Sequence, residues 1–351
     1  MAHGITNADG MAYVGRKPWH NRGTLVEGEA MTAQEAIEAA NMDWRIITVP
    51  VYTDRLSFDP TAGDDLENPG MFEEVNGKVA IIREDTQEIF NVLSSKYTAV
   101  QNVDSFKFFD DIVGSGQATY HTAGTLWGGR RVWILAKIGN GEYQLDNGEQ
   151  LESFVLLDNS HDGSSALRMR LTPVRVVCSN TLASATLSDA SFYARHTGGI
   201  MGKVSEARDL LGLNKVFMDG FLQQCNQIAS DAFSNWEMEK LTYKVLDLDR
   251  EKPMSDQFGA KADSAHSIFG LFKSGVGNGG ETRWDAYNAV TEFVDYSKGG
   301  KSSESVGSIE MEDVERRINS TWFGDGSKLR TKAWDILTLP DKKMAKALEL
   351  K

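Results

Sequence analysis

The chain has 351 residues, 41% of them hydrophobic, which is enough for a sizeable core and predicts about two domains. Its formal net charge of -13 disfavours indiscriminate binding to nucleic acid or anionic membranes, and no apolar run approaches the ~20 residues that a membrane span needs. Only two cysteines occur, Cys178 and Cys225, without CxxC spacing, so neither a disulfide framework nor a structural zinc site is expected.

The first two hundred residues predict an α+β fold, in which an antiparallel sheet is backed by helices. Residues 1–30 show no regular pattern and are expected to form an arm. A capping box at Thr32–Glu35 predicts a helix, and residues 57–77 are expected to be a loop. A second helix is expected over 103–113, and strands are expected over 43–53, over a hairpin at 78–100, and over 117–126, 130–138, 152–158 and 165–177.

The remaining chain predicts a mainly helical C-terminal part. Apolar residues recur at helical spacing over 203–233, 235–247 and 282–298, while the Gly/Ser-rich stretch 259–280 is expected to be irregular. A polar, low-complexity linker precedes two short helices at the end. The expected divisions are an arm at 1–30, an α+β core at 31–200, a helical region at 201–297, a linker at 298–309 and C-terminal helices at 310–351.

A cluster of cations and aromatic residues is the strongest binding signal. Arg168 and Arg170 alternate along one predicted strand, so they share a face. Guanidinium groups hold phosphates and aromatic rings stack on bases, so this combination favours single-stranded DNA. The predicted nucleic-acid-binding residues are Arg130, Arg131, Arg168, Arg170, Lys137, Tyr120, Trp127 and Trp133. The alternative is that the arginines follow a turn and the rings pack in the core.

Three residues near that strand are interpreted as structural. Arg175 lies among valines and is expected to pair with a carboxylate, Asp158 or Asp162. Cys178 follows two valines and is expected to be buried and inert, although a thiol at the start of a helix is a possible nucleophile. Asn180 is expected to cap a short helix that ends near residue 188.

The loop that holds Asp158, His161 and Asp162 is a weak candidate metal site, because carboxylates and imidazole bind divalent metals. Ordinary turn chemistry explains the same residues. Neither GxGxxG nor GxxxxGK[ST] is present, and the sequence predicts no cofactor and no catalytic residue.

Several segments resemble one known family. The segments TPVRVVCSNTL, RHTGGI, KPWHNRGTL, YTAVQNVDSFKFFD, DNSHDGSSALR and TRWDAYNAVTEFVDY are similar, over most of the chain, to a phage and plasmid protein family that carries the domain of unknown function nine-three-two. The resemblance implies a phage, prophage or plasmid gene, and brings no agreed activity. The predicted sheet with helices also resembles, at the level of fold, phage single-strand annealing proteins, which assemble into rings or filaments.

The leading hypothesis is a non-enzymatic protein that binds or anneals single-stranded DNA in recombination or replication. It is expected to form a homo-oligomer, a ring or a filament, in the cytoplasm of a bacterial host, away from membranes. One alternative is a metal-dependent hydrolase or nucleic-acid-modifying enzyme that uses the Asp158–Asp162 loop. Another is an interaction protein that blocks a host defence, for which the charge of -13 suits mimicry of DNA.

Overall fold

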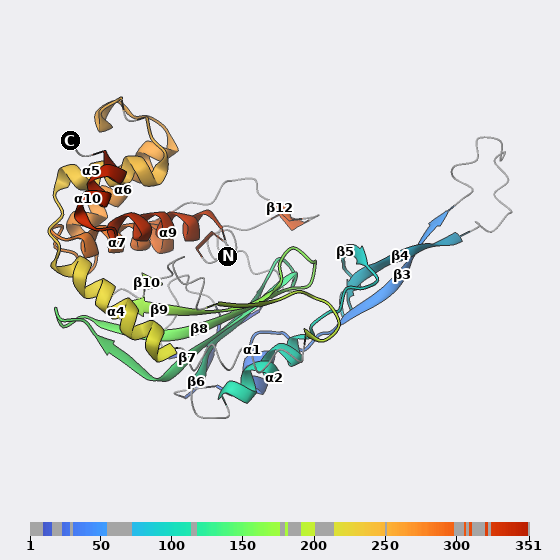
Figure 1. The fold of residues 1–351 in the computed structure, drawn as a ribbon. Helices are drawn as coiled ribbons and strands as arrows, with labels where there is room; N and C mark the ends of the chain where they lie inside the picture. The colour runs from blue at the N-terminus through green and yellow to red at the C-terminus, as the bar shows by residue number, and fades with distance from the viewer. Residues whose placement is uncertain are drawn as a thin grey trace, which may run out of the picture.

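The fold is an α+β arrangement in which a large sheet lies between two small helices and a group of C-terminal helices (Figure 1). It was obtained as a computed structural model. The structure describes residues 10–15, 23–28, 31–54, 72–113, 118–175, 180–181, 191–200, 214–249, 251–297, 305–306, 309–310, 320–321 and 324–349. Within these ranges no helix has the length and apolar character that crossing a membrane requires.

The main sheet of the described chain has the strand order β10-β9-β8-β7-β6-β1-β2, with β11 also beside β9. All neighbours are antiparallel except β1 and β2, which are parallel. The strands are β1 (Met11–Val14), β2 (Thr24–Val26), β6 (Ala118–Leu126), β7 (Arg131–Gln144), β8 (Gln150–Ser160), β9 (Leu167–Arg175), β10 (Asn180–Thr181) and β11 (Ser191–Ala194).

The N-terminal residues do more than form an arm. The β1 strand pairs with β6, and its residues 11–14 are all buried. The expectation of an irregular arm was wrong for residues 11–14. All four are buried in the large sheet, so they lack the alternation of apolar and polar residues by which a strand is usually recognised.

A second, three-stranded sheet projects from the body as an arm (Figure 1). It consists of β3 (Ile46–Asp54), β4 (Phe72–Arg83) and β5 (Ile89–Ser94) in that order. The turn after β4 contains Asp85 and Thr86, as the predicted hairpin requires. A short pair, β12 (Ser305–Val306) and β13 (Ile309–Glu310), completes the described strands.

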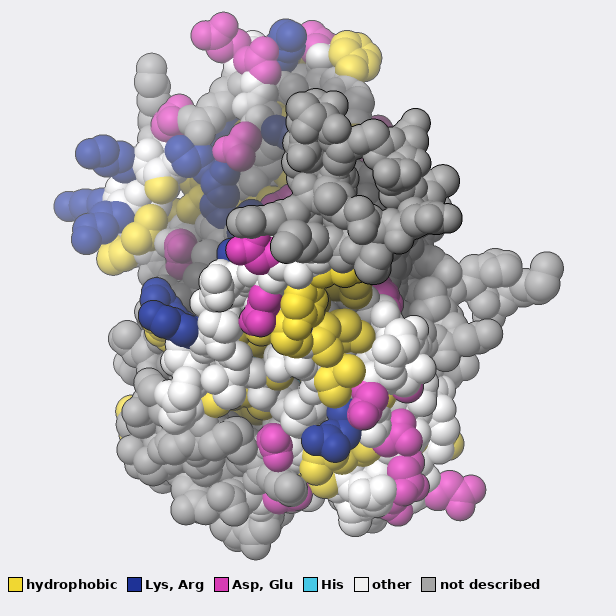
Figure 2. Space-filling model, turned by 90° about the vertical axis from the view of Figure 1, so that its right-hand side faces the viewer, with side chains coloured by type: hydrophobic (Ala, Val, Ile, Leu, Met, Phe, Trp, Pro, Cys, Tyr) yellow, Lys and Arg dark blue, Asp and Glu magenta, His cyan; other side chains and the backbone are white. Residues whose placement is uncertain are grey.

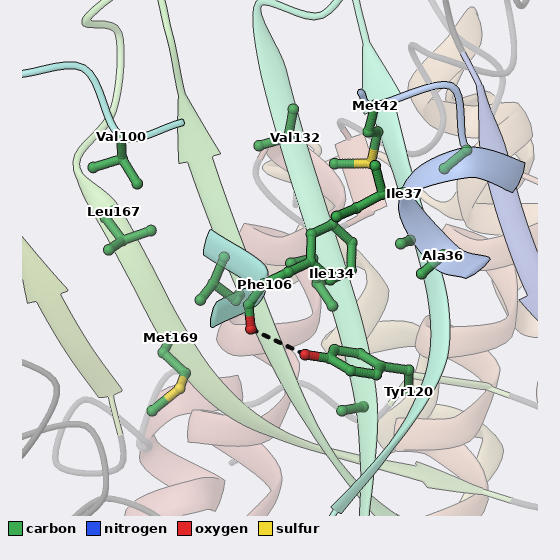
Figure 3. Close-up of a cluster of buried hydrophobic side chains, with 14 of the residues drawn as sticks. Ala36, Ile37, Met42, Val100, Phe106, Tyr120, Val132, Ile134, Leu167 and Met169 are labelled. Carbon is green, nitrogen blue, oxygen red and sulfur yellow. Dashed lines mark hydrogen bonds between the residues drawn. The ribbon is translucent and has the colours of Figure 1, made fainter. Parts of the chain in front are cut away.

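One face of the main sheet packs on α1 (Ala33–Ala39) and α2 (Asn102–Val113). Figure 3 shows this core, with Ile37 of α1 and Phe106 of α2 against Ile134 of β7. The Tyr120 hydroxyl donates to the Phe106 carbonyl at 3.0 Å and to Asp110 Oδ1 at 2.8 Å. Burial and this carboxylate raise the pKa of Tyr120 far above its ordinary value, so the phenol stays protonated.

The C-terminal helices share a second core, which Leu145 of the β7–β8 turn and Leu151 of β8 also join. The Trp284 indole donates to Glu149 Oε2 at 3.1 Å, which ties α7 to the β7–β8 turn. The helices are α4 (Asn214–Ser230), α5 (Asn235–Leu246), α6 (Ala260–Ser274), α7 (Arg283–Glu292), α9 (Asp325–Leu337) and α10 (Asp341–Leu348), with the 3-10 helix η4 (Met254–Asp256) and the π-helix η5 (Phe293–Ser297).

The α6 helix corrects the expectation that 259–280 is irregular. Its buried residues Ala262, Ala265, Ile268 and Phe272 recur every three or four positions, so one stripe of the helix faces the second core. The glycines that suggested a loose segment lie mostly at the two ends of the helix. The capping boxes at Thr32, Ser234 and Thr282 are all formed, so the predicted helix starts at 32 and 282 are confirmed.

Candidate nucleic-acid interface

The two β9 arginines share one buried carboxylate. Arg168 lies opposite Asp158 of β8 in the register of the sheet, and its Nη2 is 3.0 Å from Asp158 Oδ2. The Nη2 of Arg170 is 3.2 Å from Oδ1 of the same carboxylate. Asp158 is fully buried, whereas Arg168 and Arg170 are 34% and 30% exposed. The two arginines therefore share one face, as predicted, and each has an internal partner.

Arg131 adds a third cation near the same carboxylate. Its guanidinium lies 5.5 Å from the centroid of the Trp127 ring. Burial lowers the pKa of Arg131, while Asp158 counteracts this effect. Burial and the charge of Arg168 likewise lower the pKa of Arg170, again against the effect of Asp158, and the charge of Arg330 in α9 contributes in the same direction. The arginines on this face of the sheet therefore lie near enough to α9 for the charge of Arg330 to act on Arg170.

Arg130 and Lys137 each form an ion pair within the chain, the first buried and the second partly exposed. Arg130 is buried, pairs with Glu88 at 2.8 Å, and lies 5.0 Å from the centroid of the Phe90 ring. Lys137 Nζ is 2.7 Å from Glu152 Oε1 on the neighbouring strand. Arg130 thus connects the β6–β7 turn to β5, and phosphate binding by either residue requires that an internal ion pair be broken.

The three predicted stacking residues are buried, which does not fit that role. Tyr120, Trp127 and Trp133 are 2%, 6% and 1% exposed. Tyr120 belongs to the core under α2, and Trp127 occupies the β6–β7 turn beside Arg131. A base stacks on a ring only where the ring face is accessible. Most residues of β6 and β7 are buried on both faces of the sheet, so alternation along these strands directs neither Tyr120 nor Trp133 to solvent.

The stretch from Asp158 to Asp162 is the end of strand β8 followed by a turn, and not one loop as the sequence suggested. Asp162 Oδ1 accepts the backbone N–H of Ser164 at 2.9 Å, and Asp158 is held by the arginines. Across the part of the chain that the structure describes, no three His, Cys, Asp or Glu side chains gather in a way that holds a metal ion. Asp158, His161 and Asp162, the candidate metal ligands of the sequence analysis, therefore do not form a metal site in this arrangement.

His161 is a neutral core residue. The Asn102 amide donates to the Met42 carbonyl, so its Oδ1 accepts, and His161 Nε2 donates to it at 2.9 Å. The imidazole lies edge-on to Trp44 and stacks on Phe90. Burial, together with the charges of His196 and Arg83, lowers the pKa of His161 to about 3.

This low pKa predicts a pH-dependent stability. In the unfolded chain a histidine has a pKa of about 6.5, so His161 binds a proton more readily there than in the folded chain. The folded state therefore has its full stability above about pH 6.5 and loses stability as the pH falls below it. Between pH 7.5 and 5.5 we expect His161 to contribute a loss of about 1.4 kcal/mol, measured by urea unfolding. The variant His161→Gln should flatten this dependence, and His266→Gln on the surface of α6 should not. Equal pH slopes in wild type and His161→Gln would contradict the assignment.

The residues interpreted as structural are only partly described. Asn180 lies in β10 opposite Arg175, so residues 180–181 form a strand and not the start of a helix. The Arg175 backbone also pairs with Leu151. The side chains of Arg175 and Asn180, and the whole of Cys178, lie outside the described residues. The other cysteine, Cys225, is buried in the second core, where burial raises the pKa of its thiol.

An open groove of about 480 Å³ lies where β11 and the following residues meet the β5–α2 segment. Its walls come from residues 93–97, the β8–β9 turn at 163–166 and residues 193–197. The backbone N–H of Thr98 donates to the His196 carbonyl at 3.0 Å. Two of the segments that line the groove are therefore held together by a backbone hydrogen bond.

The groove presents cations and aromatic rings. Lys96 and Arg195 are exposed, and among the described residues no acidic side chain lines the groove. Tyr193 is 60% exposed and lies directly opposite Arg168 in the sheet register. Tyr97 and His196 stack with ring centroids 4.9 Å apart. Burial lowers the pKa of His196, so Lys96 and Arg195 supply the positive charge at neutral pH.

Sequence reasoning did not assign these groove residues to a site. Residues 195–200 were noted only as a family motif. Tyr193 and Arg195 alternate with Phe192 and Ala194, which are buried, in the same way as Arg168 and Arg170 alternate along β9. That alternation was visible in the sequence, but Lys96 and Tyr97 lie almost one hundred positions away, and only the fold brings them to the same groove.

Comparisons with known proteins give one match. No match was found among the curated proteins or among the solved structures. The fold-level resemblance to phage single-strand annealing proteins therefore has no support from solved structures. The sequence model of a family described as a domain of unknown function, DUF932, matches residues 89–322, which include β5, the main-sheet strands β6 to β11, the groove and the helices α4 to α7. The chain belongs to the DUF932 family.

Proposed function

We propose that this protein binds single-stranded DNA through the groove formed by residues 93–97, 163–166 and 193–197. In this proposal it is a non-enzymatic phage or plasmid protein that anneals or protects single strands during recombination or replication. It acts as a homo-oligomer in the cytoplasm of a bacterial host. The observation that carries the proposal is the charge of the groove: its charged lining residues are Lys96 and Arg195, in a chain with a net charge of -13.

The chemistry of the groove suits a strand without sequence choice. Exposed cations bind the phosphate backbone, and the exposed ring of Tyr193 offers a face on which any base can stack. Arg168, opposite Tyr193 and one-third exposed, extends the positive charge along the sheet. The proposal keeps the combination of cations and aromatic rings that the sequence suggested, but assigns DNA binding to β11 and the β5–α2 segment rather than to the β6–β7 hairpin.

The salt dependence of binding tests the proposal. Phosphate neutralisation releases counterions, with a log-log slope of about -0.7 per contact on single strands. The double variant Lys96→Ala/Arg195→Ala should therefore flatten the slope by about 1.4 when labelled oligonucleotide is titrated at several salt concentrations. Tyr193→Ala should weaken binding by about 1–3 kcal/mol without changing the slope, and Tyr193→Phe should keep wild-type affinity.

A charge-matched control separates this site from general electrostatics. Lys261→Ala/Lys328→Ala removes two exposed lysines from α6 and α9 and should leave slope and affinity close to wild type. Wild-type protein that does not bind at low salt would contradict the proposal. So would a groove variant that retains the full slope.

A further inference from the structure

The β3–β4–β5 arm exposes large apolar side chains. Tyr52 of β3 and Phe72 of β4 are 55% and 68% exposed, close to the end of the described strands, where Asp54 pairs with Phe72. Ile89 and Val92 of β5 are also exposed. Figure 2 looks at the molecule from the side on which the arm projects, and shows apolar side chains gathered there beside acidic ones. Residues 52–54 and 72–74, beyond the part of β4 that pairs with β5, form a ribbon of two strands only. A two-stranded ribbon gains little stability in water, so contact with a partner surface would stabilise this end of the arm.

Acidic side chains accompany this apolar surface. Glu73 and Glu74 follow Phe72 directly, and Glu84 and Asp85 lie in the exposed turn between β4 and β5. Lys78 is the exposed cation among the described β4 residues. A partner for the arm should therefore present cations around an apolar contact, because matched charges direct the encounter of two surfaces.

The α10 helix carries such cations at the opposite side of the molecule (Figure 1). Lys342, Lys343 and Lys346 are exposed, while Met344 and Leu348 face the second core. The α5 helix, which packs against α10, exposes Trp236. In a chain with a net charge of -13, a second copy is attracted only where the basic surface of one molecule meets an acidic surface of the next.

We propose that the arm of one copy docks on the α10 surface of a second copy, head to tail. This inference rests on the proposed function, which includes a homo-oligomer, and it names the surfaces by which the copies associate. Its test measures mass and does not depend on DNA binding. The two surfaces are different and lie at opposite sides of one chain. Such a heterologous contact repeats from copy to copy and builds a ring or a filament, rather than stopping at a dimer.

Two variants each remove one surface. Phe72→Ser/Glu74→Lys alters the arm, and Lys342→Glu/Lys343→Glu alters α10. Acidic residues at the first turn of a helix interact favourably with its dipole, so the second variant should keep α10 folded. Lys261→Glu/Lys328→Glu makes the same charge change on α6 and α9 and is the matched control. Mass is measured by sedimentation velocity and light scattering across a concentration series.

We expect wild type and the control to exceed the mass of one chain as concentration rises. Each interface variant should associate at least about tenfold more weakly, because the arm variant loses an aromatic contact and the α10 variant reverses two charges that face acidic side chains. An equimolar mixture of the two variants should form particles of two chains and no larger, because only one intact pair of surfaces remains. Far-ultraviolet circular dichroism checks that each variant is folded.

Other outcomes overturn the proposal. Wild type that stays monomeric excludes it, and so does a mixture that does not associate. An α10 variant that still associates like wild type would indicate contact between two arms instead. Titration of a short oligonucleotide on the monomeric variants is read separately: binding with wild-type affinity per chain supports the groove, and its absence contradicts the groove while leaving the interface result intact.

Discussion

Asp295→Leu is expected to destabilise the fold by about 3–5 kcal/mol, because it leaves the guanidinium of Arg330 buried without its carboxylate. Arg330 and Asp295 are 0% and 1% exposed, and their Nη1 and Oδ1 atoms are 3.1 Å apart. Arg330 also donates to the Thr321 carbonyl. Asp295 lies in the π-helix η5, a local widening of the helix that continues α7, and Arg330 lies in α9. The pair therefore joins two helices of the second core.

A double-mutant cycle separates this pair from loss of packing. The double variant Asp295→Leu/Arg330→Met replaces both charges by apolar side chains and should recover most of the stability lost in either single variant. Urea unfolding at fixed pH gives the four free energies. On the same helix α9, the exposed pair Asp325 and Lys328 provides a control, for which removal of the charges should cost less than about 1 kcal/mol. Additive effects of the Asp295 and Arg330 changes would contradict the prediction.

Asp158→Asn is expected to have two opposite effects. It should destabilise the fold by about 2–4 kcal/mol, somewhat less than at Asp295, because Arg168 and Arg170 are partly exposed and water screens them. It should also strengthen binding of single-stranded oligonucleotide, since Arg168, opposite Tyr193, is released from its carboxylate next to the groove. One further phosphate contact would steepen the salt slope by about 0.7.

The combination of effects makes this variant informative. Partial unfolding alone lowers both stability and binding, so a less stable protein that binds more tightly requires the released arginine. Binding is measured at a temperature at which the variant is folded by circular dichroism. Glu152→Gln, which removes the partner of Lys137 on the same sheet, is the control and should leave binding unchanged. Weaker binding by Asp158→Asn would indicate that Arg168 does not contact the DNA.

Local sequence signals predicted much of the fold. The capping box at Thr32 and the apolar spacing from residue 282 predicted helices that the structure contains. The gap between the strands expected over 117–126 and 130–138 holds Gly128 and Gly129, which form the turn between β6 and β7 with positive φ angles of 67° and 94°. A side chain at Gly129 would lie within 2.5 Å of the Trp44 ring, so this turn also needs glycine for space. These features depend on a few neighbouring residues, which is why they are readable without the fold.

The role of the arginines needed more than local pattern. The alternation of Arg168 and Arg170 correctly placed them on one face of a strand, but their shared partner, Asp158, is set by the register between β8 and β9. The same holds for Arg130, whose carboxylate partner is Glu88, 42 positions earlier. Sequence spacing carries no direct information about such pairs, and a search for exposed cations therefore included residues that the fold uses internally.

The sequence by itself determined the class of the fold, the order of most elements, the helix starts and the predominance of acidic residues over basic ones. The tertiary structure decided which cations remain available at the surface. Alternation along a strand shows that two residues share a face, but not whether that face meets water, and here β6, β7 and β8 are mostly buried on both faces while Tyr193 of β11 is exposed. Exposure is a property of the packed layers, so the groove that joins Lys96 to Arg195 exists only because distant strands pair and bring residues 93–97 beside residues 193–197.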